Sequence, residues 1–214
     1  MKQSLGFFAR FAVVAAVAFW AWGLVSAGYL ASLVPAVNGL FGLAHLPVRL
    51  GLRGEALVYA YGRADGGVLQ LQALGHESIV LNMVAGLSLL AASPTLGFRR
   101  MTAWMAAAAA LLWLTHVLTF FAAGQVALWE YAGHLAPSLR APLASEFALS
   151  LPYDRSRLLL RILEQWNVWA RYALCLGLWF RAMASAAAPV AVRQQARARQ
   201  RVSWVGAQAV ARHT

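Results

Sequence analysis

Two long apolar stretches separated by a very short basic turn constrain this chain more than any other feature of its sequence. Residues 79–96 and 101–128 are each long enough to cross a bilayer, because an α-helix rises about 1.5 Å per residue. The turn between them carries Arg99 and Arg100, and paired cations at such a turn mark the cytoplasmic face of a membrane. The two stretches therefore predict a transmembrane helical hairpin.

Two further apolar runs, residues 11–33 and 162–184, bring the prediction to four membrane spans. The composition supports this interpretation, since 61% of the residues are hydrophobic and 12% are charged, whereas about a quarter of the residues of a soluble domain are charged. The predicted fold class is mainly α: a four-helix transmembrane bundle with a small external β-hairpin insert.

The predicted spans divide the chain into four parts. Pro35 is expected to end the first helix or to force a turn soon after it. We interpret this helix as an uncleaved anchor, although Val25-Ser26-Ala27 leaves cleavage as an alternative. The parts are an N-terminal transmembrane anchor (1–35), an external β-rich insert (36–77), a three-helix membrane bundle with an external loop at 129–155 (78–188), and a basic cytoplasmic tail (189–214).

In the external insert, apolar and polar residues alternate in the way that is typical of β-strands. Residues 57–61 and 68–73 alternate in this way, and the glycine-rich segment 62–67 between them predicts a hairpin turn. An isolated hairpin is marginally stable, so residues 48–53 are a candidate third strand, or the sheet lies on the membrane surface or on a partner. Residues 38–46 are a candidate short interfacial helix.

The net charge of +11 is distributed unevenly over the predicted loops. The segments on one side of the membrane carry cations and no carboxylate, whereas those on the other side balance arginines against aspartates and glutamates. This asymmetry predicts a membrane protein with both termini in the cytoplasm. The basic excess then reflects topology and contact of the arginine-rich tail with anionic lipid headgroups, so no nucleic-acid partner is predicted.

Polar residues inside the predicted spans form the candidate functional site. Counting from the cytoplasmic arginines places Asn82, His116 and Glu164 at one depth and Arg171 deeper, and groups at such depth are costly unless they are paired or solvated. Glu164 is the expected partner of Arg171, His116 or Arg161. The alternative is that these residues only tie the helices together. The candidate residues of this intramembrane layer are Asn82, His116, Thr119, Glu164, Asn167 and Arg171.

Several chemistries are disfavoured by the spacing of these residues. A bis-histidine haem needs a second histidine at the depth of His116, whereas His76 and His134 lie at or beyond the outer interface. A zinc site lacks a second ligand at helical spacing, and no phosphate loop, serine-nucleophile elbow or metalloprotease motif occurs. We therefore predict no catalytic residue, cofactor or metal. The single cysteine, Cys175, is interpreted as a small packing residue.

Three segments resemble the core hairpin of the exosortase and archaeosortase membrane transpeptidases: residues 81–90, 98–100 and 115–120. Matched to that family, Val84 stands at the place of the nucleophilic cysteine, His116 at that of the asparagine and Thr119 at that of the arginine. His134 is a loose match for a later histidine of the family. The catalytic cysteine and arginine are thus both replaced.

The order of the segments is also similar to that of the small exosortase-associated membrane proteins, which have an N-terminal span, an external β-rich insert and three further spans. The resemblance implies a protein of the bacterial inner membrane that acts as a non-catalytic accessory subunit of a membrane protein-sorting or export system in Gram-negative bacteria, with a membrane protein as its partner. The alternative function is a membrane enzyme or a small-molecule or proton carrier that uses the intramembrane His/Glu/Arg layer.

Overall fold

A computed structural model of the protein describes residues 2–54, 56–62, 66–73, 76–93, 96–134, 138 and 153–186. The protein is mainly helical and carries a small three-stranded antiparallel sheet. Its helices, in chain order, are α1 (Lys2–Leu43), α2 (His76–Ala91), α3 (Phe98–Gly133) and α5 (Tyr153–Gln165), followed by one π-helical turn, η1 (Trp166–Ala170), and a terminal helical segment at residues 171–186.

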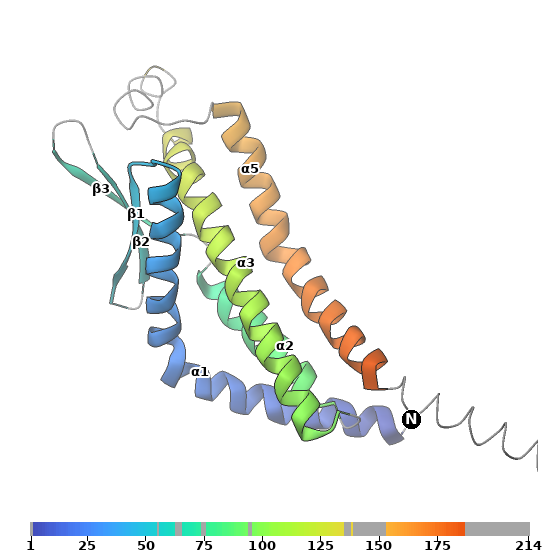
Figure 1. Ribbon diagram of the computed structural model, residues 1–214. Helices are drawn as coiled ribbons and strands as arrows, with labels where there is room; N and C mark the ends of the chain where they lie inside the picture. The colour runs from blue at the N-terminus through green and yellow to red at the C-terminus, as the bar shows by residue number, and fades with distance from the viewer. Residues whose placement is uncertain are drawn as a thin grey trace, which may run out of the picture.

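The helices run alternately up and down the molecule (Figure 1). The second half of α1 and the whole of α3 run towards the sheet, whereas α2, α5 and the terminal helical segment run away from it. We call the end opposite the sheet the foot of the molecule. Helix α3 is the central helix, because it contacts α1, α2 and α5.

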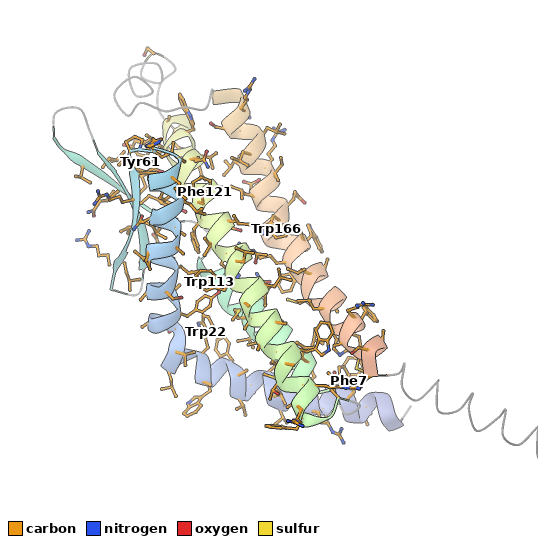
Figure 2. All side chains as sticks on the ribbon, viewed as in Figure 1. Phe7, Trp22, Tyr61, Trp113, Phe121 and Trp166 are labelled. Atoms are coloured by element: carbon orange, nitrogen blue, oxygen red, sulfur yellow. The ribbon has the colours of Figure 1, made fainter. Side chains whose placement is uncertain are left out.

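Helix α1 is longer than expected and is bent. It continues through Pro35 to Leu43, so the prediction that Pro35 ends the first helix was wrong, and so was the alternative of a separate interfacial helix at 38–46. An internal proline costs a helix roughly 3 kcal/mol, but Leu33 and Val37 on either side of it are fully buried, and this packing keeps the helix continuous. Figure 1 shows the first half of α1 crossing the foot, and the bend lies near Trp22 (Figure 2).

The sheet confirms the predicted hairpin and includes the candidate third strand. Its strands are β1 (Val48–Arg53), β2 (Ala56–Gly62) and β3 (Val68–Gln72), in the order β1-β2-β3 with both pairs antiparallel. Alternate residues face opposite sides of a strand. The inner face therefore collects buried side chains such as Leu50, Leu57 and Tyr59, whereas Arg49 and Gln70 are exposed on the outer face.

Helix α2 is shorter than the predicted span at 79–96. It ends at Ala91, three residues before Pro94, and its 16 residues give a length of about 24 Å. Among the described residues, two helices are long and apolar enough to cross a membrane, within Leu5–Leu43 and Phe98–Gly133. A bundle of four membrane-spanning helices therefore stays a prediction.

Candidate functional site

Four helical segments bring polar side chains into the middle of the molecule. Asn82 on α2 and His116 on α3 are 0% exposed, and Arg171, which follows the π-helical turn, is 1% exposed. Tyr29 of α1 joins them through a hydrogen bond to His116. The Arg171 guanidinium interacts electrostatically with both Tyr29 and His116, so these side chains form one group. We call these four residues the polar layer.

A tightly packed apolar layer fixes the register of three of these helices. A Cβ atom added to Gly86 of α2 would lie 2.9 Å from Cys175 Sγ and 3.3 Å from Leu112 Cδ1, so only glycine allows this approach. The Cys175 thiol also donates a long hydrogen bond of 3.6 Å to the backbone oxygen of Asn82. We call Gly86, Leu112 and Cys175 the glycine layer.

The polar layer lies one helical turn above the glycine layer. Asn82, His116 and Arg171 are each four residues from a member of the glycine layer on their own helix. Because neighbouring helices run in opposite directions, each four-residue step leads away from the foot. The three polar side chains therefore stand at the same height.

The hydrogen bond of His116 leaves one ring nitrogen unused. Tyr29 Oη lies 2.6 Å from His116 Nδ1, and the two rings meet edge to face with centroids 6.0 Å apart. A neutral imidazole has one donor nitrogen and one acceptor nitrogen, so if Nδ1 accepts the tyrosine proton, Nε2 carries a hydrogen. Within the described residues Nε2 is buried without a hydrogen-bond partner.

The side-chain amide of Asn82 is also unsatisfied. Its Nδ2 and Oδ1 atoms are both buried, and neither has a hydrogen-bond partner among the residues that the structure describes. An unsatisfied buried polar group costs roughly 1–3 kcal/mol, and native proteins usually satisfy such groups with a side chain, an ordered water or a ligand. The polar layer thus has free hydrogen-bonding capacity on two helices.

Three predicted site residues have other surroundings. Thr119 is buried, but its hydroxyl donates to Thr115 O at 2.7 Å, a bond within its own helix. Glu164 has an exposed side chain, and its carboxylate interacts with Glu130. Asn167 lies in the π-helical turn, and its side chain is outside the described part of the structure. Thr119 and Glu164 therefore do not belong to the polar layer.

The expectation that Arg171 lies deeper than His116 was wrong, because the depth count on its helix started at the wrong residue. Arg100 Nη1 at the foot of α3 donates to Ser185 O at 3.5 Å, so the terminal helical segment continues past Arg181 towards the foot, and counting depth from Arg181 starts too early. The π-helical turn also adds one residue to the helix, where the Arg171 N–H donates to Trp166 O. One extra residue turns a helix by about 100°, so Glu164 and Arg171, on either side of this turn, do not share one face: Glu164 is exposed and Arg171 is buried.

No sequence pattern pointed clearly to the role of Tyr29. A tyrosine near the end of an apolar run is typical of an interfacial anchor or a packing residue. Its hydrogen bond to His116 joins residues 87 positions apart, and only the fold brings them together. A tyrosine ring that meets a buried histidine edge to face could have been proposed only with knowledge of the bend in α1.

The sheet is attached to the helices by buried hydroxyl groups. Tyr59 Oη donates to Phe120 O at 2.9 Å, and Tyr61 Oη donates to Gly124 O at 2.6 Å. Figure 2 places Tyr61 between the sheet and the upper part of α3. Burial raises the pKa of both tyrosines above the ordinary value of 10, so both stay protonated donors. A Cβ atom on Gly124 would lie 2.5 Å from Phe41 Cζ, so glycine is required at this joint.

An open cavity lies at the sheet end of α3, between its last turns and the start of α5. Its volume is about 230 Å³, and its lining includes a carboxylate, a histidine and an arginine. Ser156, which is 1% exposed, also lines it. In contrast with the enclosed polar layer, this end of the molecule offers polar surface to the outside. The polar lining residues are Glu130, His134, Ser156 and Arg157.

No protein-family model, curated protein or solved structure matches this chain. Among the described residues, no three histidine, cysteine, aspartate or glutamate side chains are grouped so that they could hold a metal ion. The function is therefore argued from the geometry of the polar layer and of the sheet.

Proposed function

We propose that this chain is a multi-pass protein of the bacterial inner membrane that acts as a non-catalytic accessory subunit of a membrane protein-sorting or export system. The observation that carries the proposal is the sheet, which is attached to the helices by its inner face, while no helix of the described part of the chain packs on its outer face. Tyr59 and Tyr61 make this attachment to α3. Such a sheet is a fixed platform on which another protein can dock.

The surface of α1 supports the membrane assignment. Large apolar side chains along its first half are between 56% and 75% exposed, and they face several directions around the helix. A soluble monomer rarely exposes so large an apolar surface, whereas lipid covers it without cost. The residues concerned are Leu5, Phe8, Val13, Val17, Phe19, Trp20, Leu24 and Val25.

The distribution of charge supports the proposed orientation. Arg99 and Arg100 are exposed at the foot, at the start of α3, and the sheet lies at the other end of the molecule (Figure 1). By the positive-inside rule the foot faces the cytoplasm, which puts the sheet outside. Periplasmic reporter fusions placed after residue 65 and cytoplasmic reporters at residue 214 should both be active. Activity of one reporter type at both positions would refute the topology.

The enclosure of the polar layer supports a role other than catalysis. Asn82 and His116 are 0% exposed, so a substrate could reach them only if the helices separated. The resemblance to exosortase-associated proteins supports an accessory role as well. In this view the polar layer sets the register of the helices, as buried polar groups do in some bundles.

Co-purification in mild detergent tests the accessory role. The full-length protein should retain a stoichiometric membrane partner, and Arg49→Gln on the outer face of the sheet should weaken that complex. Arg161→Gln is the matched control, because it removes the same charge from an exposed position on α5, on the other side of α3 from the sheet. A protein that purifies as a clean monomer, or equal loss with both variants, would contradict the proposal.

The unsatisfied atoms of the polar layer favour a second candidate, a proton or small-molecule carrier. His116 Nε2 and the Asn82 amide could bind a water or a polar ligand between the helices. His116→Phe paired with Tyr29→Phe removes the polar pair while keeping its volume. Unchanged proton flux in proteoliposomes with full thermal stability would favour the accessory role, whereas lost flux with normal assembly would favour the carrier.

A further inference from the structure

The free edge of β3 exposes backbone groups that no described residue bonds. The Ala73 N–H, just after β3, donates to Leu57 O at 2.8 Å. In an antiparallel pair the residues that exchange hydrogen bonds alternate along the strand, so Leu69 and Leu71 also bond to β2 in the observed register. The N–H and C=O groups of the remaining residues point away from the sheet. These residues are Val68, Gln70 and Gln72.

The other edge of the same sheet is closed by the chain itself. The side-chain amide of Asn38 donates to Leu50 O at 2.9 Å and accepts from the Leu50 N–H at 2.7 Å. Asn38 thus gives Leu50 in the middle of β1 the two hydrogen bonds that a neighbouring strand would give, and α1 packs against this strand. Exposed strand edges are usually covered or blocked in this way, and within the described residues β3 lacks such cover.

A guanidinium group stands beside the free edge. Arg53 of β1 reaches across the outer face, and its Nη1 donates to Gln70 Oε1 at 3.5 Å. The described residues of the three strands include Arg49 and Arg53 and no carboxylate. A strand added to β3 would lie about 4.8 Å away, so an acidic side chain opposite Gln70 would come within reach of Arg53.

We propose that β3 binds an extended acidic segment of a partner polypeptide, which adds to the sheet as a fourth strand. The partner's backbone would pair with Val68, Gln70 and Gln72, and its outward side chains would include a carboxylate that Arg53 binds. A second copy of this chain fits less well, because it would bring another Arg53 to the same outer face. The inference rests on the proposed function, since the sheet must be displayed outside the membrane.

The orientation of Gln70 permits a clean test. Its N–H points to the free edge, so Gln70→Pro removes one outward donor without breaking a bond between β2 and β3. Gln70→Ala loses the same side chain but keeps the N–H, and so is the matched control. The probe is a fluorescent octapeptide that alternates glutamate with valine, and its comparison peptide alternates lysine with valine.

Binding is measured by fluorescence anisotropy with the full chain in detergent micelles. We expect the glutamate peptide to bind the wild type and Gln70→Ala with affinities within about threefold, and Gln70→Pro about tenfold or more weakly. The lysine peptide should bind weakly, and Arg53→Gln should weaken glutamate-peptide binding severalfold. If Gln70→Pro unfolds the sheet, the wild type is tested instead with a peptide that is N-methylated at alternate residues. This peptide lacks the N–H groups that would bond to β3, so it should bind more weakly than the unmodified peptide.

Three outcomes would overturn the inference. The first is equal binding of the glutamate and lysine peptides, and the second is equal binding of the N-methylated and unmodified peptides. The third is a wild-type dimer in light scattering that Gln70→Pro converts to a monomer, because this result would assign the edge to a second copy of the chain. The peptide assay needs neither a cell nor a native partner. A negative peptide result with a co-purified partner therefore refutes the strand addition alone, whereas the absence of any partner refutes the accessory role.

Discussion

The contact between Gly86 of α2 and Cys175 of the terminal helical segment offers a direct test of how the helices are aligned. Gly86→Ala adds a carbon that would lie 2.9 Å from Cys175 Sγ, and Cys175→Ala removes that sulfur. The double variant therefore moves one buried atom from one helix to the other. It should restore most of the packing that either single variant disturbs.

The expected energies follow from these distances. Overpacking a buried site costs about 1–3 kcal/mol, and the higher helix propensity of alanine offsets up to about 1 kcal/mol of this. Cys175→Ala loses one buried heavy atom, which costs about 1 kcal/mol. In the double variant the closest remaining neighbour is Leu112 Cδ1 at 3.3 Å, which needs only a small shift. The coupling energy should be about 1–3 kcal/mol in favour of the double variant.

Thermal unfolding in mild detergent, followed by tryptophan fluorescence, measures this coupling. For a chain of this size 1 kcal/mol changes Tm by roughly 2–4 °C, so the double variant should recover roughly 2–12 °C relative to the sum of the single effects. Gly177→Ala is the control, because a Cβ atom at Gly177 meets nothing within 4 Å. Its effect should add to that of Cys175→Ala.

Additive effects for Gly86→Ala and Cys175→Ala, with a coupling below about 0.5 kcal/mol, would show that the two residues are not in contact. The glycine layer would then be misplaced. The alignment of Asn82, His116 and Arg171 would fail with it, because that alignment is counted from the glycine layer.

Three further predictions concern the attachment of the sheet. Gly124→Ala, whose Cβ would lie 2.5 Å from Phe41 Cζ, should destabilise the joint by about 1–3 kcal/mol and speed limited proteolysis of the sheet, and Phe41→Leu should partly rescue it. Tyr61→Phe should cost about 1 kcal/mol. Burial raises the pKa of Tyr61 above 10, so the stability that its neutral hydroxyl gives the folded protein is complete below pH 10 and is lost as pH rises through the folded-state pKa. Unfolding measured against pH should therefore show a smaller alkaline loss of stability for Tyr61→Phe than for the wild type. Asn38→Leu should leave the Leu50 N–H unbonded and speed its hydrogen exchange, and unchanged exchange would contradict the role given to Asn38.

The strands were predictable because their signals are local. Alternation at 57–61 and 68–73 around a glycine-rich turn is enough to define a hairpin. The attachment of the sheet to α3 was not predictable, because the hydrogen bond from Tyr59 to Phe120 spans 61 residues. Tyrosines on a strand are favourable wherever that strand lies, so their residue type did not reveal their partners.

Three of the four residues of the polar layer could be predicted from the sequence, but their register could not. Asn82, His116 and Arg171 are conspicuous because they interrupt apolar runs, and all three are buried in the structure. Glu164 was placed with them because a regular α-helix puts residues seven apart on one face. The π-helical turn lies between Glu164 and Arg171 and breaks this periodicity, and an extra residue within a helix leaves no mark in the sequence pattern.

The positions at which helices end were also difficult to predict from the sequence. A proline usually marks a boundary because it removes one N–H and restricts the preceding residue. At Pro35 the buried neighbours outweigh that local cost, whereas α2 stops before Pro94 as the local rule expects. The difference lies in tertiary packing, which a single sequence does not display.

The short length of α2 has a consequence for the lipid around the protein. If the chain crosses the bilayer as proposed, a helix of about 24 Å stands where the hydrocarbon layer is about 30 Å thick. Acyl chains next to α2 would have to compress or tilt, at a cost of fractions of a kcal/mol for each ångström of mismatch. The protein should therefore gather in thinner patches of membrane, or associate there with a neighbour that shields this face from lipid.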